Sequence, residues 1–391
     1  MSNVDWDDVL EQVRKAYTES GVRGAFLVLD QYDEPEDKVE GVWREIIRAR
    51  IRIAQGEYPA ALAILDAQHQ HLNRQEHPVR YGRVLMLEGI VHSWLGDPAI
   101  ASVYLKEAVE IARGSGDTDT VRRALRTVAD LACEEHKFQE ALDLMEGQPG
   151  AEEAFLRARA LAGLGRLSLA LDVANESLLE PHIPHQNRIN LQVLRAWICC
   201  EGGYARGGME ALEGLTNNDD PLVEYCRGHC DLLAGKRLEG GEHWNRFLDD
   251  AVKGKAVENA SMVRLDLANL AASDGDIVQM RHFLKSYREA RAWAGISHLV
   301  PYSVILEGIS DLERGGDLRT DGILAAINEA VDFGTLVASA RLAAMKGAPP
   351  VIRIALERRL LERAKEYVPL EGGPTFENHR RVKRIREILS E

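Results

Sequence analysis

The stretch WLGDPAIASVYL, from Trp94 to Leu105, decides the fold, because it ends one helix, turns at a glycine and starts a second helix. Variants of this pattern recur along the chain. They read AQGEYPAALAIL at 54–65, EEHKFQEALDLM at 134–145, GLGRLSLALDVA at 163–174 and SDGDIVQMRHFL at 273–284. An internal repeat of this kind indicates an array of similar units stacked along the chain.

The turn of each repeat recurs at a mean spacing of roughly 37 residues, which is typical of helical hairpins. The stretches between the turns are rich in Ala, Leu, Glu and Arg, which favour helices, and only 6% of the residues are aromatic. The sequence therefore predicts an all-α array with almost no sheet. The expected turn positions are Gly21, Gly56, Gly96, His136, Gly165, Gly203, Gly235, Gly275 and Gly315.

The unit around Trp94 has small and large residues at the spacing of a known repeat signature. Small residues let the two helices of a hairpin approach, and large ones fill the gap to the next hairpin. In chain order they are Leu85, Gly89, Gly96, Asp97, Ala101, Leu105 and Ala108. This unit resembles a tetratricopeptide repeat. The resemblance covers about residues 5–330 and is strongest over 42–181.

The resemblance implies a right-handed superhelix of about nine helix-turn-helix repeats that ends in a C-terminal helical cap. We expect tetratricopeptide-like repeats at 1–181, less regular repeats continuous with them at 182–335, and a cap with a basic final helix at 336–391. A chain of 391 residues suits such a stack, in which each unit contacts only its neighbours.

The resemblance also implies where a partner would bind. In the family, the first helix of each hairpin lines the concave side of the superhelix, and its exposed side chains select the ligand. The spacing places basic and aromatic side chains there in units two to five, which would suit an extended acidic segment, since Arg forms forked hydrogen bonds with carboxylates. The predicted partner-binding residues are Arg50, Arg83, Arg123, Arg126, Arg159, Trp43 and Trp94, with Met86 and Phe155 between them.

A second interpretation of these side chains stays open. The arginines would then be solvated or paired with nearby acids, and the rings would belong to the core between helices. The acids in question are Glu45, Glu88, Asp130 and Glu152.

Motifs for catalysis are missing from the sequence, including phosphate-binding loops, zinc-protease helices and nucleophile elbows. Cys199, Cys200, Cys226 and Cys230 could together supply zinc ligands. Small buried residues are the alternative interpretation of these cysteines, because their spacing is not that of a zinc knuckle. We therefore expect no catalytic residue, no metal and no cofactor.

Two connecting stretches are expected to be structural. RGSGDTDT at 113–120 follows a predicted helix and has the residues of a helix end joined to a helix start. His69, His71 and His77 lie in the polar stretch AQHQHLNRQEHP, which we interpret as a solvated connector between repeats.

Charge restricts the partners. The net charge of −14 disfavours general binding to nucleic acid or an anionic membrane. The stretch from Arg380 to Leu389 is nevertheless a basic amphipathic helix, which would either contact nucleic acid or, as we prefer, cover the last hairpin. Residues 1–42 are acidic and residues 351–391 basic, so end-to-end association into a homo-oligomer is an alternative to solvated ends.

The expected location is the cytoplasm. No apolar run reaches the roughly 18 residues that span a bilayer, the start of the chain is acidic, and the five cysteines show no disulfide framework.

The predicted function is that of a scaffold or adaptor that binds a protein segment in the concave groove. The alternative is a regulatory sensor that binds a peptide or small ligand and controls a partner such as a transcription regulator. Such sensors would resemble the tetratricopeptide regions of bacterial regulators and peptide-pheromone receptors.

Overall fold

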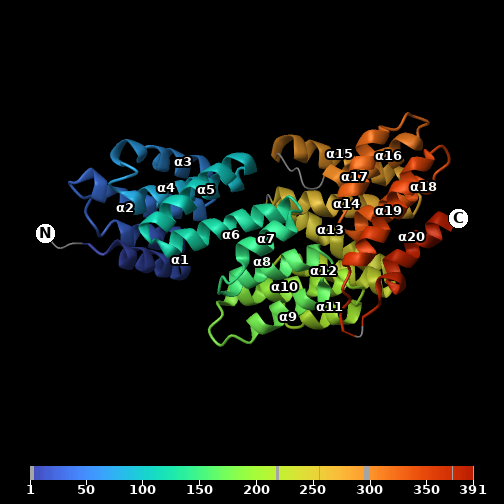
Figure 1. The fold of residues 1–391 in the computed structure, drawn as a ribbon, viewed down its shortest axis with the longest axis horizontal. Coiled ribbons are helices and arrows are strands. Elements are labelled where there is room, and N and C mark those ends of the chain that lie inside the picture. Colours follow the sequence, from blue (N-terminus) through green and yellow to red (C-terminus); the bar gives the residue numbers. More distant parts are fainter. Residues whose placement is uncertain (1–3, 217–219, 255, 295–299, 372, 391) are drawn as a thin grey trace. The chain divides into compact units, whose positions relative to one another are not determined.

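The computed structural model describes residues 4–216, 220–254, 256–294, 300–371 and 373–390. Helices follow one another through these ranges (Figure 1), and the only bridge of β type within them is an isolated one between Arg166 and Val368. The predicted all-α fold is confirmed. No helix in these ranges is long and apolar enough to cross a membrane.

The chain divides into two compact units, residues 1–131 and 132–391, which we describe separately. The sequence-based division at 181 and 335 stays a prediction, as do the handedness of the superhelix and the number of repeats. The first unit contains α1 (Trp6–Leu29), α2 (Lys38–Ala54), α3 (Tyr58–Asp66), α4 (Pro78–Trp94), α5 (Pro98–Ser115) and most of α6 (Thr118–Glu134), with a 3-10 turn at His69–His71.

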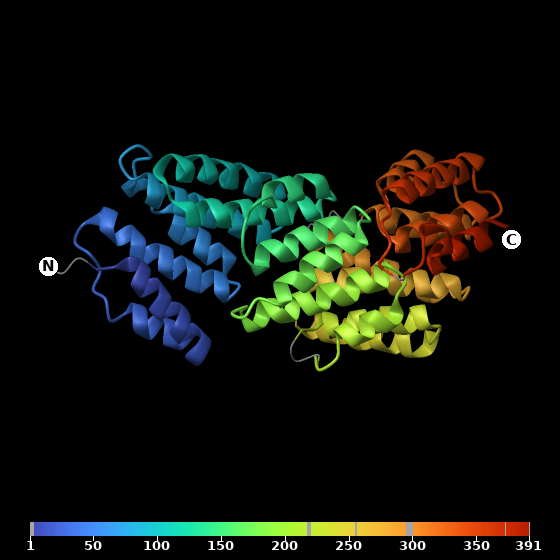
Figure 2. The same ribbon diagram turned by 60° about the horizontal axis from the view of Figure 1, so that its bottom comes forward.

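The second unit continues the series of hairpins, and Figure 2 shows them stacked beside one another. The pairs are α8 (Ala151–Gly163) with α9 (Leu167–Leu178), α10 (His185–Glu201) with α11 (Ala205–Ala211), and α12 (Leu222–Ala234) with α13 (Arg237–Lys253). They are followed by α14 (Val257–Ser273) with α15 (Ile277–Ala294), α16 (Val300–Leu312) with α17 (Thr320–Glu329), and α18 (Phe333–Ala344) with α19 (Pro350–Glu366). The unit begins with α7 (Phe138–Met145) and ends with a 3-10 turn at Phe376–Asn378 and α20 (Arg380–Ser390).

The predicted turn positions are confirmed by the backbone. All of them, from Gly21 to Gly315, have positive φ angles between 60° and 87°. A residue with a Cβ atom rarely adopts this conformation, which explains why glycine recurs at the turns. His136, with φ of 60°, adopts it without being a glycine.

Of the two connecting stretches, 113–120 agrees with its prediction and the one that contains His69 does not. The stretch 113–120 is the predicted helix end and start, because Gly116 ends α5 with φ of 76° and the Asp117 carboxylate accepts bonds from the Thr120 backbone N–H and hydroxyl. The interpretation of His69 as a solvated connector residue is wrong. Its Nε2 lies 2.9 Å from a carboxylate oxygen of the fully buried Glu88, which needs a partner away from water.

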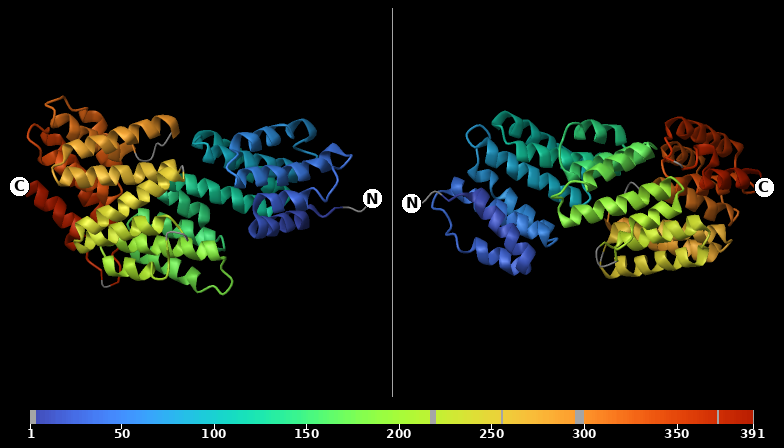
Figure 3. Two further views of the ribbon diagram at one scale, coloured as in Figure 1. Left: turned by 180° about the vertical axis from the view of Figure 1, so that it is seen from behind. Right: turned by 90° about the horizontal axis from the view of Figure 1, so that it is seen from below.

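The C-terminal segment runs back along the second unit (Figure 3). It forms the bridge in which the Val368 N–H donates to the Gly165 carbonyl oxygen, 2.8 Å away. Further on, His379 Nε2 lies 2.9 Å from the Glu201 carbonyl oxygen, and Arg380 donates to the Leu233 carbonyl oxygen. The described residues from Arg363 to Arg381 therefore cross the ends of α8, α10 and α12, and we call them the C-terminal strap. Gly372, part of the expected Gly-Gly-Pro break, lies outside the described residues.

The final helix α20 is amphipathic, as predicted. Its Val382, Ile385 and Ile388 are buried and the helix packs against α18, whereas Lys383, Arg384 and Arg386 are exposed. This is the covering role that we preferred for the helix.

Candidate functional site

The second unit contains an open cavity of about 1200 Å³. Its walls come from α8, α10, α12, α14, α16 and α18, and the C-terminal strap and α20 line one side of it. Sites for drug-sized ligands measure roughly 300–1,000 Å³, so this cavity has room for a larger ligand.

Several wall helices contribute a stripe of side chains at helical spacing. On α14 these are Asn259, Met262, Asp266 and Asn269, which follow one another at three or four residues and therefore share one face. On α10 the stripe consists of Asn190, Val193, Leu194, Trp197 and Glu201. The stripes combine apolar side chains with amides and carboxylates.

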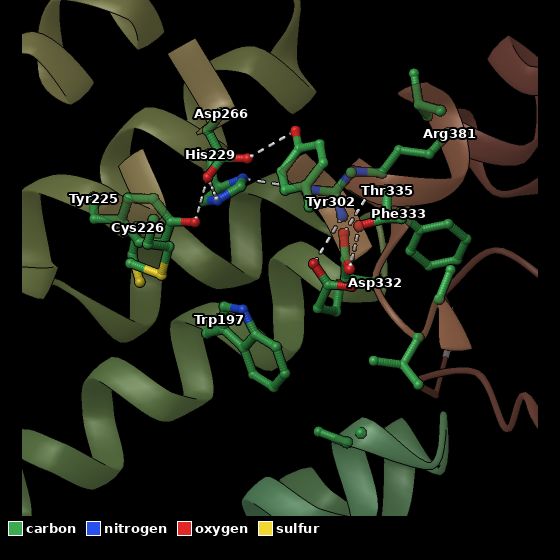
Figure 4. A pocket seen from close by; sticks show the side chains of 18 of the residues that line it. Trp197, Tyr225, Cys226, His229, Asp266, Tyr302, Asp332, Phe333, Thr335 and Arg381 are labelled. Atoms are coloured by element: carbon green, nitrogen blue, oxygen red, sulfur yellow. Dashed lines mark hydrogen bonds and ion pairs between the residues drawn. The ribbon is translucent and has the colours of Figure 1, made fainter. Parts of the chain in front are cut away.

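Aromatic rings cover part of the wall (Figure 4). Tyr225 of α12 stacks on Trp244 of α13 with ring centroids 6.0 Å apart, and His229 packs edge-on against both rings. Trp197 of α10 and Phe155 of α8 are only partly buried and also face the cavity. Such rings provide large apolar contact surfaces at little entropic cost.

A buried carboxyl group, that of Asp266, lies among these rings. The Tyr225 hydroxyl donates to it at 2.6 Å and the Tyr302 hydroxyl at 3.3 Å (Figure 4). Burial raises the pKa of Asp266 to about 7, although both hydroxyls favour the charged form. Burial and the nearby Arg381 charge lower the pKa of His229 well below its usual value, so its ring is neutral at pH 7.

Arg381 extends from α20 toward these groups. Its guanidinium donates to the Glu201 carboxylate at 2.8 Å and lies over the Phe333 ring, 5.7 Å from the centroid. It also approaches His229 Nδ1 at 3.4 Å. One side chain thus connects α20 to α10, α12 and α18 across the cavity.

The predicted partner-binding arginines are divided between the two units. Arg159 lies in the second unit and lines the cavity beside Phe155. Arg50, Arg83, Arg123 and Arg126 lie in the first unit, on α2, α4 and α6. We therefore treat Arg159 with the cavity and the other four as a separate group.

Within the first unit, the structure brings several of the predicted side chains together. The Arg83 guanidinium lies over the Trp43 ring, 4.6 Å from its centroid, and donates to Asp7 at 2.9 Å and to Asp117 at 3.0 Å. Arg123 donates to Asp119 at 2.8 Å. Glu45 and Glu88 are therefore not the acids that pair with these arginines. Glu45 binds Arg44 and Arg48, and Glu88 binds His69.

Arg50 differs from its neighbours because it forms no ion pair with a described residue, although the charge of Asp119 acts on it and opposes the lowering of its pKa. Its Nε is buried and makes no hydrogen bond there. Burial, together with the charges of Arg123, Arg83 and Arg14, lowers the pKa of Arg50 to about 10.

Two other predicted positions do not join this group. Met86 is 1% exposed and belongs to the core, so its expected place in a groove is wrong. Trp94 is 65% exposed and stacks on Tyr58, with ring centroids 6.0 Å apart.

Most residues of the cavity wall were not predicted from the sequence. Asn190, Asn259, Asp266, Asn269 and Arg341 line it and were not singled out. A signal was present on α14, where polar residues recur at helical spacing on a face that is otherwise apolar.

The cysteines are buried thiols. Cys200 Sγ and Cys230 Sγ lie 3.3 Å apart, and burial raises the pKa of Cys199 to about 11. Within the described ranges, no group of three or more His, Cys, Asp or Glu residues is arranged to hold a metal ion.

Comparison with solved structures finds similar folds. A Rap protein complexed with competence and sporulation factor matches with 14% identity and a TM-score of 0.49, over 99% of this chain and 96% of that one. The apo form of the quorum sensor NprR from B. thuringiensis matches with 14% identity and a TM-score of 0.50, over 73% and 87%. A tetratricopeptide repeat protein from Parabacteroides merdae matches with 14% identity and a TM-score of 0.41, over 72% and 99%.

The chain has the fold of the NprR structure, a tetratricopeptide-like array of helical hairpins. At 14% identity this similarity shows the fold alone. No family model matches the chain, and no curated protein matches it by sequence.

Proposed function

We propose that this protein is a regulatory sensor that binds a short peptide in the cavity of its second unit. The observation that carries this proposal is the composition of the cavity wall, which combines aromatic rings, asparagine amides and charges of both signs. A peptide presents the matching groups: apolar side chains, backbone amides and charged termini. A small metabolite would leave much of a 1200 Å³ cavity unfilled.

The asparagines supply the most specific part of this argument. An asparagine amide donates and accepts, so it pairs with the N–H and C=O groups of an extended peptide. The side-chain amide of Asn259 makes no hydrogen bond to any described residue, although it lines the cavity. Asn190 accepts a bond from Gln186 at 3.0 Å, which leaves its own NH₂ group available.

The C-terminal strap provides a way for binding to be sensed. Arg381 and Phe333 line the cavity, and Arg381 already bridges α20 to Glu201 of α10. A peptide that contacts these side chains would stabilise the strap on the helix ends that it crosses. We propose that a protein partner recognises this stabilised form.

A cytoplasmic location, the absence of catalysis and the lack of nucleic-acid binding stay predictions.

The proposal is tested by affinity selection with an equimolar random hexapeptide library that has free termini. The full chain is incubated with the library, separated from unbound peptide by gel filtration and examined by mass spectrometry. We expect a restricted set of hexapeptides to be retained. A selected peptide at 100 times its Kd should stabilise the protein by about 2.7 kcal/mol, which raises Tm by roughly 5–10 °C.

Two matched variants locate the site. Asn259→Ala should weaken binding of the selected peptide by about tenfold, which corresponds to one or two lost hydrogen bonds. Asn245→Ala, on the exposed face of α13, should bind like the wild type. Retention of no hexapeptide, or equal effects of the two variants, would refute a peptide site in this cavity.

A second candidate function is that of an adaptor that binds an acidic partner segment along Arg50, Arg83, Arg123 and Arg126, with Trp43 as an apolar contact. Arg50 favours it, because a half-buried cation that forms no ion pair is stabilised when a ligand supplies a carboxylate at contact distance. Arg159 would contribute to the cavity ligand instead.

The adaptor is tested by affinity capture with the Arg123→Glu, Arg126→Glu double variant, read by mass spectrometry. A stoichiometric acidic protein should be captured by the wild type and lost with the variant. Arg48→Glu, on the exposed side of α2, is the control and should still capture it. Identical capture by all three proteins would eliminate this candidate.

A further inference from the structure

One end of the cavity is lined by cations from three helices. They are Arg237 of α13, Arg341 of α18, and Lys383 and Arg384 of α20. Two of them reach the last turns of α14, where Arg237 donates to the Leu270 carbonyl oxygen at 3.0 Å and Arg341 to that of Asn269 at 2.7 Å.

Arg341 differs from the other two arginines in its partners. Arg237 is held by Asp274, with its Nε 2.8 Å from the carboxylate, and Arg384 lies 3.2 Å from Glu387. Arg341 donates only to neutral oxygens, the carbonyl and side-chain oxygens of Asn269. No carboxylate of the described residues forms an ion pair with it.

The free part of Arg341 has the shape that binds a carboxylate. Both of its bonds use Nη1, so Nε and Nη2 donate to no described residue. These two nitrogens form an edge of the planar guanidinium that can donate two parallel hydrogen bonds to the oxygens of one carboxylate. The half-buried side chain lines the cavity and is not enclosed in the core.

Charge favours an anion at this position. Burial and the charges of Arg384 and Arg237 lower the pKa of Arg341 to about 10, so the folded protein holds this cation at a cost. A ligand carboxylate would offset the cost. Capping of α14 explains the bond from Nη1, because a cation is favourable at a helix C-terminus. Capping does not explain why Nε and Nη2 of Arg341 donate to no described residue.

We infer that Arg341 is a specificity-determining residue that binds a carboxylate of the peptide ligand. This inference rests on the proposed function, since it needs a peptide in the cavity. The carboxylate belongs either to the C-terminus of the peptide or to an Asp or Glu side chain, and the two sources can be separated by experiment.

The test compares two random hexapeptide libraries that differ only at the C-terminus, one with a free carboxylate and one amidated. The wild type, Arg341→Gln and Arg341→Lys each undergo affinity selection, and the retained peptides are quantified by mass spectrometry. Arg353→Gln, on the exposed face of α19, serves as the matched control. Circular dichroism verifies that each variant is folded. If Arg341→Gln does not fold, the test relies on Arg341→Lys, which keeps the positive charge.

If the C-terminus is bound, the wild type should retain free peptides at least about tenfold better than amidated ones. If a side chain is bound, it should retain both libraries with enrichment of Asp or Glu at one position. In either case Arg341→Gln should abolish the preference, Arg341→Lys should reduce it, and Arg353→Gln should keep it.

The outcomes that contradict the inference are distinct from failure of the proposed function. If the wild type retains peptides without any carboxylate preference, or if Arg341→Gln retains the same set in the same amounts, the role of Arg341 is refuted and the cavity remains a peptide site. If the wild type retains no peptide at all, the proposed function fails and this inference fails with it.

Discussion

Asp266 places an ionisable carboxyl group in the cavity wall, where other side chains largely shield it from water. Asp266 is surrounded by Tyr225, Tyr302 and His229, and its side chain is only 12% exposed. Sequence patterns did not predict this environment. An aspartate in a helix is usually exposed, and this one is covered by Tyr225 of α12 and Tyr302 of α16, which are distant in the sequence.

Asp266 should make stability depend on pH. Its pKa is about 7 in the folded protein, whereas the ordinary value for an aspartate is 3.8, so the folded state binds this proton more tightly than the unfolded chain does. Its stability contribution is therefore largest at low pH and is lost as pH rises through about 7. Asp266→Asn cannot ionise, so it should gain up to about 3 kcal/mol relative to wild type between pH 5 and pH 8.

This prediction is measured by urea denaturation at each pH. Asp250→Asn, at an exposed position of α13, is the control, because folding does not desolvate its carboxylate. If the free energies of unfolding of wild type and Asp266→Asn differ by the same amount at every pH in this range, burial does not destabilise the charged form of Asp266.

At the scale of elements, the sequence predicted hairpins and their turns well. Local geometry requires the turn glycines and the small residues of α4 and α5. Because each repeat has the same requirement, these residues recur in the sequence and can be recognised there. The C-terminal strap could not be predicted. Arg363 donates to the Gly163 carbonyl oxygen and Arg381 to Glu201, which are contacts across 200 and 180 residues with no periodic signal.

Gly89 tests the packing of the α4–α5 hairpin. A Cβ atom at this position would lie 2.6 Å from Leu105 Cγ and 3.2 Å from the Ala101 carbonyl oxygen. Gly89→Ala should therefore destabilise the first unit by about 1–3 kcal/mol. Gly41→Ala, in α2, meets no atom within 4 Å and should instead stabilise it by about 0.5–1 kcal/mol. Urea denaturation measures both, and equal effects would contradict this close approach.

Ile385 tests the covering role of α20. It is fully buried on the apolar face of a helix whose opposite face is charged. Ile385→Ala should destabilise the second unit by about 2–5 kcal/mol, whereas Arg386→Ala, on the exposed face, should change stability by less than about 0.5 kcal/mol. If denaturation shows that Ile385→Ala has no effect, α20 does not close the second unit.

At the scale of the whole molecule, two compact units follow one another along the chain, each with its own apolar core. Helical repeats stabilise mainly their neighbours, so the two units need not unfold together. The division was not visible in the sequence, because the repeat pattern continues across α6 without a linker.

Differential scanning calorimetry should therefore resolve two transitions. Gly89→Ala should shift one of them and Ile385→Ala the other, by roughly 2–8 °C per kcal/mol according to unit size. A single transition that both variants move equally would show that the chain unfolds as one cooperative unit.

Hydrogen–deuterium exchange, with and without a hexapeptide selected from the library, tests whether a peptide binds in the cavity of the second unit. We predict slower exchange in α10, α14, α18 and α20, whose side chains line the cavity, and unchanged exchange in α2 and α4 of the first unit. Protection confined to the first unit, or no protection anywhere, would contradict the claim.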